Sequence, residues 1–437
     1  MNYKETINYL YHVAPLFQSQ GVGAYKPGLQ TTNLLDAHLG YTHRQYQTIH
    51  VGGTNGKGSC AHTLAALLQL SGLKTGLYTS PHLVDFRERI RVNGQPVPED
   101  YVVQFIERER PFFEPLHPSF FEITTAMAFK YFSDASVDVA VVEVGLGGRL
   151  DCTNVITPVL SVITNISLDH TQLLGDTLAA IAREKAGIIK SGIPVVVGEA
   201  QPETRRVFAE VAHARRSPIT FAEDVPEVLS SEVGTDGLRH YSTRNYGVLT
   251  GGLVGECQEK NTNTILCAVS TLRRLGLLGL ENMSHATLDR AFRDVCSLTG
   301  LRGRWETVQH NPEMVCDTGH NPGGWQYIGH ELQQRVSCGQ RLHIVFGVMA
   351  DKDVDQILAE LPVEATYYFT QASTPRALAV DELGRRAAAF RLAGKLFQTV
   401  LAAIDAARTA AGASDFIYVG GSSFVVADAL ASLDDGV

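Results

Sequence analysis

Runs of β-branched residues alternate along the chain with stretches in which apolar residues return every three or four positions. The first run covers residues 48–51, and the stretch after it carries apolar residues at helical spacing. Three further runs, at residues 137–144, 159–163 and 193–197, are almost continuously valine and isoleucine. Such runs are typical of parallel strands buried on both faces, so the pattern predicts an α/β fold. Residues 176–190 keep helical spacing and predict another helix.

The pattern changes after about residue 225, where short alternating runs are broken by Gly234, Gly237 and Gly247. We expect a small antiparallel patch attached to the main sheet there, followed by helices near 261–275 and 285–298. Strand–helix alternation resumes with runs at 342–346, 366–369 and 416–419. The sequence thus predicts a large domain over 1–298, a hinge over 299–303 and a smaller Rossmann-like α/β domain over 304–437.

The composition narrows the class of protein. Of 437 residues, 44% are hydrophobic and 19% charged, which excludes wholesale disorder, collagen and a heptad-rich rod. Lys and Arg number 37 against 46 Asp and Glu, a formal charge of −9 that argues against nucleic-acid and anionic-lipid partners. No apolar run approaches the about 18 to 20 residues that span a bilayer, and the N-terminus does not resemble a secretory signal. Seven scattered cysteines without a CxxC pair favour reduced thiols, no structural zinc and a cytoplasmic location.

The run Gly52-Gly53-Thr54-Asn55-Gly56-Lys57-Gly58-Ser59 lies between a predicted strand and a predicted helix. Glycines let backbone N–H groups turn toward a phosphate, and the helix start adds partial positive charge. The strict Walker pattern fails twice, because Val51 occupies its first glycine position and Gly58 separates Lys57 from Ser59. A glycine-rich turn is often only structural, but the charged Gly-Lys step favours nucleotide binding.

This loop resembles that of the ATP-dependent Mur ligase superfamily and, within it, of the folylpolyglutamate synthases and dihydrofolate synthases. Eight further motifs follow in the family's order, at residues 78–83, 85–90, 143–151, 168–170, 184–190, 303–305, 317–322 and 351–353. The resemblance implies an ATP-dependent amide ligase that adds L-glutamate to dihydropteroate, to the glutamyl carboxylate of reduced folates, or to both. An acyl phosphate would be the intermediate, and ADP and phosphate would be released. We expect both acceptors to be used, and a monomer.

The resemblance also implies a nucleotide and metal site. The expected ATP contacts are Thr54, Asn55, Gly56, Lys57, Gly58, Ser59, Asn261, Arg304 and Asp317. The expected Mg²⁺ ligands are Ser80, Glu143 and His170, and the family allows a monovalent cation as well. Glu143 ends an apolar strand at the edge of the sheet where ligands bind in open α/β folds, although a satisfied strand-end acid would look the same. Without the family match, His170 would read as a polar loop residue.

Lys185 has two interpretations. A lysine on a mainly apolar helix usually extends its ammonium into water. The matching lysine in the family is typically carbamylated, so the resemblance implies N6-carboxylysine at Lys185. The residues that it assigns to catalysis are Lys57, Lys185, His320 and Arg304.

By the same resemblance, the pteroate or folate site is lined by Lys26, Pro27, Gly28, Ser119, Phe120, Phe121, Glu122, Arg149, Leu150, Asp151 and Cys152. Flat pterin rings suit aromatic faces, but both Phe residues fit core packing equally well. The family's acidic–basic pair is here Gln30-Thr31, which weakens the case for dihydropteroate.

In the smaller domain, Thr318-Gly319 departs from the family's residues at two small positions while Asp317, His320, Asn321 and Pro322 are kept. The match implies that Arg304, Asp317 and His320 reach the nucleotide from this domain, with closure at the hinge completing the site. For Arg304 the alternative is a surface salt bridge. Two other classes of protein stay open: a cell-wall Mur ligase and a non-catalytic, ATP-gated binding protein.

Overall fold

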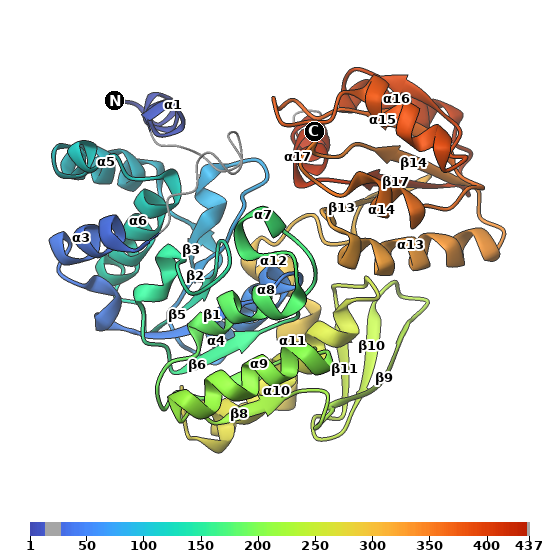
Figure 1. The fold of residues 1–437 in the computed structure, drawn as a ribbon. Helices are drawn as coiled ribbons and strands as arrows, with labels where there is room; N and C mark the ends of the chain where they lie inside the picture. The colour runs from blue at the N-terminus through green and yellow to red at the C-terminus, as the bar shows by residue number, and fades with distance from the viewer. Residues whose placement is uncertain (14–27, 435–437) are drawn as a thin grey trace. The chain divides into compact units, whose positions relative to one another are not determined.

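The chain forms two compact units. The structure, a computed structural model, describes residues 1–13 and 28–434 (Figure 1). The first unit comprises Met1–Val254 with Gln258–Leu301, and the second comprises Gly255–Cys257 with Arg302–Val437. The sequence offered no reason to group residues 255–257 with the second unit.

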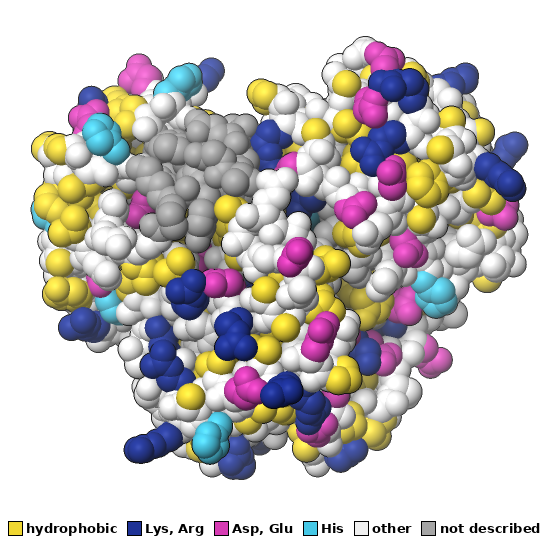
Figure 2. All heavy atoms as spheres, in the orientation of Figure 1, with side chains coloured by type: hydrophobic (Ala, Val, Ile, Leu, Met, Phe, Trp, Pro, Cys, Tyr) yellow, Lys and Arg dark blue, Asp and Glu magenta, His cyan; other side chains and the backbone are white. Residues whose placement is uncertain are grey.

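In the described part of the chain, no helix combines the length and the apolar character that crossing a membrane requires. Acidic and basic side chains are interspersed over the face seen in Figure 2.

An eight-stranded sheet forms the centre of the first unit, in the order β4-β3-β2-β5-β1-β6-β7-β8. Its strands are β1 (Gln47–Gly52), β2 (Thr75–Tyr78), β3 (Ile90–Val92), β4 (Gln95–Pro96), β5 (Val139–Glu143), β6 (Leu160–Ile163), β7 (Val195–Val197) and β8 (Ile219–Phe221). The six strands from β2 to β8 in this order run parallel, whereas β3 and β4 extend the sheet antiparallel. The predicted parallel sheet is confirmed, and its antiparallel edge is an addition.

Alternate residues of β5 enter two different cores. Val139 and Val141 pack in the core that contains α4 (Lys57–Leu70) and α10 (Gln258–Arg274). Ala140 and Val142 face the opposite core, which contains α5 (Glu99–Phe113) and α6 (Phe120–Asp134). Burial on both faces explains the unbroken apolar run in this strand. The remaining helices of this unit are α1 (Tyr3–Val13), α3 (Gln30–His38), α7 (Thr171–Leu174), α8 (Leu178–Lys185), α9 (Pro202–Arg215), α11 (His285–Arg293) and α12 (Val295–Thr299).

The antiparallel patch is a sheet of its own, which corrects the expectation that it joins the main sheet. It consists of β9 (Val228–Val233), β10 (Arg239–Thr243) and β11 (Val248–Gly251). Tyr241 and Leu249 pack from it into the core around α4, so side-chain packing rather than strand pairing attaches it. Two predicted helices also differ from expectation. The helix predicted over 176–190 ends at Lys185, and the helix predicted over 285–298 is divided at Asp294 into α11 and α12.

The second unit holds a six-stranded sheet in the order β12-β13-β17-β14-β15-β16. Only β12 is antiparallel to its neighbour among these strands, which are β12 (Glu306–His310), β13 (Glu313–Asp317), β14 (Leu342–Phe346), β15 (Thr366–Thr370), β16 (Gly394–Phe397) and β17 (Phe416–Gly420). The helices are α13 (Pro322–Ser337), α14 (Val354–Ala359), α15 (Val380–Ala389), α16 (Val400–Ala410) and α17 (Ser423–Asp434). Trp325 of α13 packs edge-on against Phe346 and Tyr418 in the core. The predicted second α/β domain is confirmed.

Candidate active site

Four neighbouring parallel strands bring the predicted nucleotide and metal residues to one edge of the first sheet. In the order β2-β5-β1-β6, Ser80 follows β2, Glu143 ends β5, the loop 53–56 follows β1, and His170 follows β6. Because the strands run parallel, their carboxyl ends lie at the same edge, where open α/β folds bind ligands. The loop after β1 precedes α4, and the loop after β6 precedes α7 (Figure 1).

Two glycines let the loop pass close to other parts of the chain. Gly53 has a φ of 136°, and a Cβ added there would lie 1.9 Å from Thr164 Oγ1. Gly56 has a φ of 80° and immediately precedes α4, and its added Cβ would lie 2.1 Å from Asn261 Oδ1. Both positions therefore require glycine for conformation and for space. The approach of Asn261 also brings this predicted ATP contact against the loop.

A segment behind the loop holds its backbone. Thr54 N donates to Asn165 O at 2.9 Å, and Asn55 N donates to the side-chain Oδ1 of Asn165 at 2.9 Å. Thr164 Oγ1 donates to Asn55 O. The N–H groups of Thr54 and Asn55 thus face the protein, contrary to the expectation that the glycine-rich turn directs its N–H groups to a phosphate. The first turn of α4, whose N–H groups have no acceptor within the helix, is the better anion site.

Lys57 and Lys185 both bind carbonyl oxygens of the loop. Lys57 Nζ donates to Thr54 O at 2.9 Å, and Lys185 Nζ donates to Gly53 O at 2.8 Å. Lys185 is only 5% exposed, so it does not extend into water as a lysine on an apolar helix ordinarily would. Burial, assisted by the charge of Lys57, lowers the pKa of Lys185 to about 7. A large fraction of this amine is therefore neutral near pH 7.

Glu143 and Ser80 lie against each other. Ser80 N donates to Glu143 Oε2 at 3.0 Å, and the carboxylate is 3% exposed. His170 has left-handed backbone geometry, with a φ of 50°, and its N donates to Asp169 Oδ1 at 2.9 Å. A hydroxyl, a buried carboxylate and an imidazole are donors that suit a divalent ion, and the oxygen donors suit a hard one such as Mg²⁺.

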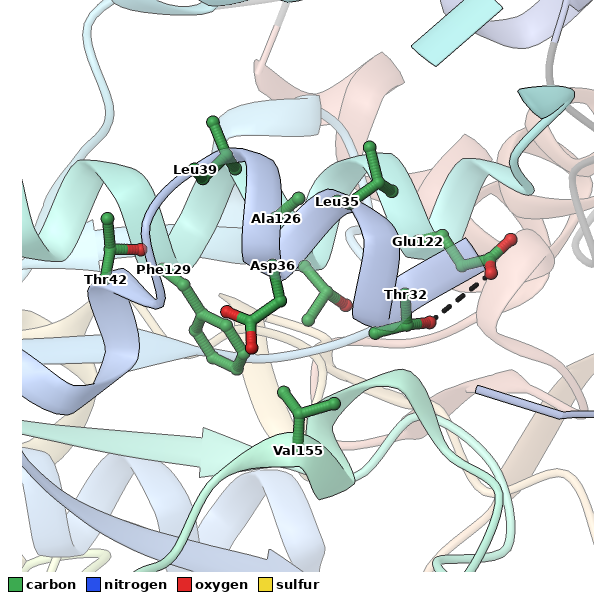
Figure 3. A pocket seen from close by; sticks show the side chains of 10 residues that line it. Thr32, Leu35, Asp36, Leu39, Thr42, Glu122, Ala126, Phe129 and Val155 are labelled. Carbon is green, nitrogen blue, oxygen red and sulfur yellow. Dashed lines mark hydrogen bonds between the residues drawn. The ribbon is translucent and has the colours of Figure 1, made fainter. Parts of the chain in front are cut away.

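The acceptor-side residues fall into two groups. Ser119 and Glu122 form the capping box of α6, and Glu122 also accepts from Thr32 Oγ1 at 3.3 Å (Figure 3). Phe120 is 1% exposed and packs in the core. Phe121 is only partly buried, and its ring stacks on Tyr78 with a centroid distance of 5.7 Å. Of Phe120 and Phe121, only Phe121 therefore retains an accessible surface.

The loop after β5 closes on Asp151. Its carboxylate accepts from Leu146 N at 2.7 Å and from Thr153 N at 3.0 Å, and burial raises its pKa. Cys152 follows, and burial together with Asp151 and Glu122 raises the pKa of its thiol. Arg149 is half exposed and pairs with Glu184 at 2.9 Å. The predicted contacts Lys26 and Pro27 lie outside the described residues, and Gly28 precedes α3 with a φ of 108°.

In the second unit, the predicted residues gather where β13 ends. Asp317 accepts from Trp305 N at 2.8 Å and from Gly319 N at 2.7 Å, and burial raises its pKa while the charge of Arg304 opposes the shift. Arg304 Nη1 donates to Gly303 O at 3.1 Å and to Thr318 Oγ1. His320 Nδ1 lies 3.0 Å from Thr318 O. These contacts hold Arg304 by backbone and hydroxyl oxygens, unlike a simple surface salt bridge.

Comparison with known proteins shows the family to which the chain belongs. Residues 51–268 match the Mur ligase middle domain, and residues 303–423 match the Mur ligase glutamate ligase domain. Dihydrofolate synthase/folylpolyglutamate synthase from Bacillus subtilis is 35% identical over 369 residues, covering 82% of this chain and 84% of that protein. The Escherichia coli protein of the same name is 34% identical over 417 residues, covering 93% and 91%.

Solved structures agree as well. Mycobacterium tuberculosis folylpolyglutamate synthase, complexed with ADP and AMPPCP, has a TM-score of 0.85 at 32% identity and covers 99% of each chain. Escherichia coli FolC in complex with DHPP and ADP has a TM-score of 0.83 at 32% identity and covers 100% of this chain and 98% of that one. The chain belongs to the folylpolyglutamate synthase/dihydrofolate synthase family. As a member of this family, it is an ATP-dependent, ADP-forming ligase of L-glutamate, and not a cell-wall ligase or a binding protein without catalysis.

Sequence reasoning missed several residues of this folate ligase. Asn165, which accepts from the backbone N–H groups of Thr54 and Asn55, lies two residues beyond the end of β6. A polar residue at the carboxyl end of a buried strand was the available signal, as it was for Glu143. His50 and Thr153, which are both fully buried, were not predicted either, because the contact between them spans 103 residues and no local pattern contains it.

Proposed function

We propose that this ligase adds L-glutamate both to dihydropteroate and to reduced folates. The Bacillus subtilis and Escherichia coli relatives are each named for both activities. The departure at Gln30-Thr31 makes dihydropteroate the acceptor that needs the more careful test.

The observation that supports nucleotide binding is the position of Lys57 on the phosphate loop. Lys57 Nζ donates to Thr54 O, and α4 begins at Lys57. A lysine at a helix N-terminus favours a triphosphate. We propose that ATP is bound by Thr54, Asn55, Gly56, Lys57, Gly58, Ser59, Asn261, Arg304 and Asp317. For Thr54 and Asn55 the side chains are the groups to test, because their N–H groups donate to Asn165.

Ser80, Glu143 and His170 would hold Mg²⁺, and the family also allows a monovalent cation. A related structure, of a bifunctional folylpolyglutamate synthase/dihydrofolate synthase, has Mn, AMPPNP and L-glutamate bound. Bound Mg²⁺ would neutralise phosphate charge. The buried carboxylate of Glu143 next to the Ser80 backbone fits such an ion.

We propose that Lys185 is carbamylated. The neutral amine adds to the carbon of CO₂ and loses one proton to solvent, which leaves a carbamate with one negative charge. A pKa of about 7 keeps much of the amine neutral near pH 7, which this reaction needs. The Lys185 amine now donates to Gly53 O. A carbamate anion in its place would face a carbonyl oxygen that cannot donate a hydrogen bond to it. We therefore expect the carbamate to turn from Gly53 O toward the cations of the site.

The proposed reaction has two steps. A carboxylate oxygen of the acceptor attacks the γ-phosphorus of ATP, forming an acyl phosphate and releasing ADP. The amine of L-glutamate then attacks the acyl carbon, the bond to the phosphate oxygen breaks, and the amine proton leaves. Lys57, Arg304 and His320 would stabilise charge on the transferred phosphoryl group, since positioning and electrostatics dominate such transfers. Gly28, Ser119, Phe121, Glu122, Leu150, Asp151 and Cys152 would surround the acceptor.

A side-by-side assay tests the proposed function. The purified enzyme is incubated with ATP, Mg²⁺ and labelled L-glutamate, with either dihydropteroate or tetrahydrofolate as acceptor. We expect label to enter both products, with one ADP formed for each glutamate added. Incorporation with tetrahydrofolate alone would reduce the assignment to a folylpolyglutamate synthase, and incorporation with neither would overturn it.

A further inference from the structure

A buried chain of hydrogen bonds joins the central strand β1 to the loop that closes on Asp151. His50 Nε2 lies 2.9 Å from Thr153 Oγ1, and Thr153 Oγ1 donates to Asp151 Oδ1. His50 and Thr153 are fully buried, and Asp151 is 4% exposed. Water therefore has little access to replace any link of this chain.

The chemistry of the three groups fixes the direction of each hydrogen bond. An ionised carboxylate can only accept hydrogen bonds. Asp151, which accepts from Leu146 N and Thr153 N, therefore accepts from the Thr153 hydroxyl as well. The hydroxyl has one proton, so its lone pair accepts from His50, which must carry hydrogen on Nε2. Burial lowers the pKa of His50 to about 3, in keeping with a neutral ring. Nδ1 of His50 has no hydrogen-bond partner among the described residues.

The two residues at the ends of this series of hydrogen bonds, His50 and Asp151, differ in how firmly the fold holds them. His50 pairs with Val142 of β5 on one side and with Ser161 of β6 on the other, in the centre of the sheet. At the other end, Asp151 caps the short 3₁₀ helix η5 (Cys152–Val155), outside any strand. The sheet therefore fixes the position of the loop through His50, and not the reverse.

We propose that His50 is a positioning residue for the acceptor, acting through Thr153 to fix Asp151 and, with it, Leu150 and Cys152. The inference rests on the proposed function, in which these loop residues surround the pteroate or folate. Val155 belongs to η5, which Asp151 caps, and it lines the pocket between α3 and α6 together with Thr32 and Glu122 (Figure 3). A loop shifted at Asp151 would disturb this side of the acceptor site. The backbone of β1 that leads to the phosphate loop keeps both of its strand partners.

Two pairs of variants test the proposal. His50→Gln keeps an N–H donor at a reach similar to Nε2, whereas His50→Leu keeps the bulk and loses the donor. Thr153→Ser keeps the hydroxyl, whereas Thr153→Val keeps the shape and loses both links. The KM values for the acceptor and for ATP are measured for all four variants, with tetrahydrofolate and with dihydropteroate.

We expect His50→Leu and Thr153→Val to raise the KM for the acceptor at least about fivefold, a change of about 1 kcal/mol, and to leave the KM for ATP within about twofold. We expect His50→Gln and Thr153→Ser to remain near wild type in both. A purely structural role would instead lower the folded fraction or weaken both substrates together. If His50→Leu does not fold, the isosteric Thr153→Val decides the question.

The failures of the two ideas are distinguishable. An unchanged KM for the acceptor in Thr153→Val, or an equal rise for acceptor and ATP, would overturn the positioning role while the wild-type enzyme still joins glutamate to its acceptor. A wild-type enzyme that adds glutamate to neither acceptor would overturn the proposed function, and the inference with it.

Discussion

Lys57 and Lys185 place their side-chain nitrogens on adjacent carbonyl oxygens of one loop, those of Thr54 and Gly53. Burial, assisted by the charge of Lys57, lowers the pKa of Lys185 to about 7. The amine of Lys185 therefore changes charge near neutral pH, which suits it to carbamylation. Lys57 stands at the start of α4, where a phosphate is favoured.

Activity should depend on bicarbonate through Lys185. Because carbamylation consumes the neutral amine, we expect bicarbonate activation to be weak at about pH 6 and to increase through about pH 7. Lys185→Met should lose most activity and should not respond to bicarbonate. The measurement is glutamate incorporation in CO₂-depleted buffer with bicarbonate added back. A Lys185→Met variant as active as wild type at every bicarbonate level would contradict the prediction.

Lys185 should also give the folded protein a characteristic pH dependence of stability. Its pKa falls from 10.5 to about 7 on folding, so the unfolded chain binds more protons between these values. The free energy of unfolding should therefore rise with pH across this window, by up to about 1 kcal/mol per pH unit. The destabilisation is complete below about pH 7 and is absent above 10.5.

Urea unfolding of wild type and Lys185→Met in CO₂-free buffer measures this slope, provided the transition is two-state. We expect the variant to lose it. Lys190→Met is the matched control. Burial lowers the pKa of Lys190 only to about 8, so this variant should keep the rise of the unfolding free energy between pH 7 and 8. Equal slopes in wild type and Lys185→Met would show that folding does not lower the pKa of Lys185.

Gly56→Ala should abolish tight nucleotide binding. The new Cβ would lie 2.1 Å from Asn261 Oδ1, so the Asn261 side chain must leave its place against the loop or the loop must shift. We expect the Kd for ADP to rise at least about tenfold, because Asn261 is a proposed ATP contact and Gly56 immediately precedes the first turn of α4. Gly40→Ala is the control: its φ of 78° nearly equals the 80° of Gly56, but its added Cβ meets no atom within 4 Å. Calorimetry that gave equal Kd values for the two variants would argue against this site.

Glu143→Gln should raise the Mg²⁺ requirement. The amide keeps the size of the side chain and an oxygen that accepts from Ser80 N, but it loses the negative charge. We expect the Mg²⁺ concentration for half-maximal activity to increase at least about tenfold, with the folded fraction unchanged by circular dichroism. An unaltered Mg²⁺ titration would remove Glu143 from the metal site.

The sequence predicted the parts of the fold whose side chains are buried on both sides. Strands β5 and β6 were found because their residues between two cores are almost all apolar, and helix α4 because its apolar residues recur at helical spacing. Strand β16 was not predicted, because it is a largely exposed strand at the edge of the sheet, and exposed positions leave the hydrophobic pattern unchanged. The attachment of the β9–β11 sheet depends on the packing of Tyr241 and Leu249, which local alternation does not encode.

The site shows the same division. Glu143 and the phosphate loop stand at strand ends, and topology alone brings strand ends together. The contact of Asn55 N with Asn165 spans 110 residues and decides where the loop directs its N–H groups. No local pattern contains it. The hydrogen bonds that link His50 through Thr153 to Asp151 span a similar sequence distance, and the hydrophobic pattern does not contain them either.

Transfer of ¹⁸O tests the central claim most directly, namely that this site activates the acceptor carboxylate by phosphorylation. The acceptor is prepared with ¹⁸O in the carboxylate and is incubated with the enzyme, MgATP and L-glutamate, and the phosphate released is examined by mass spectrometry. The account predicts one carboxylate oxygen in each phosphate formed. Phosphate without ¹⁸O, accompanied by normal formation of the glutamylated product, would contradict it.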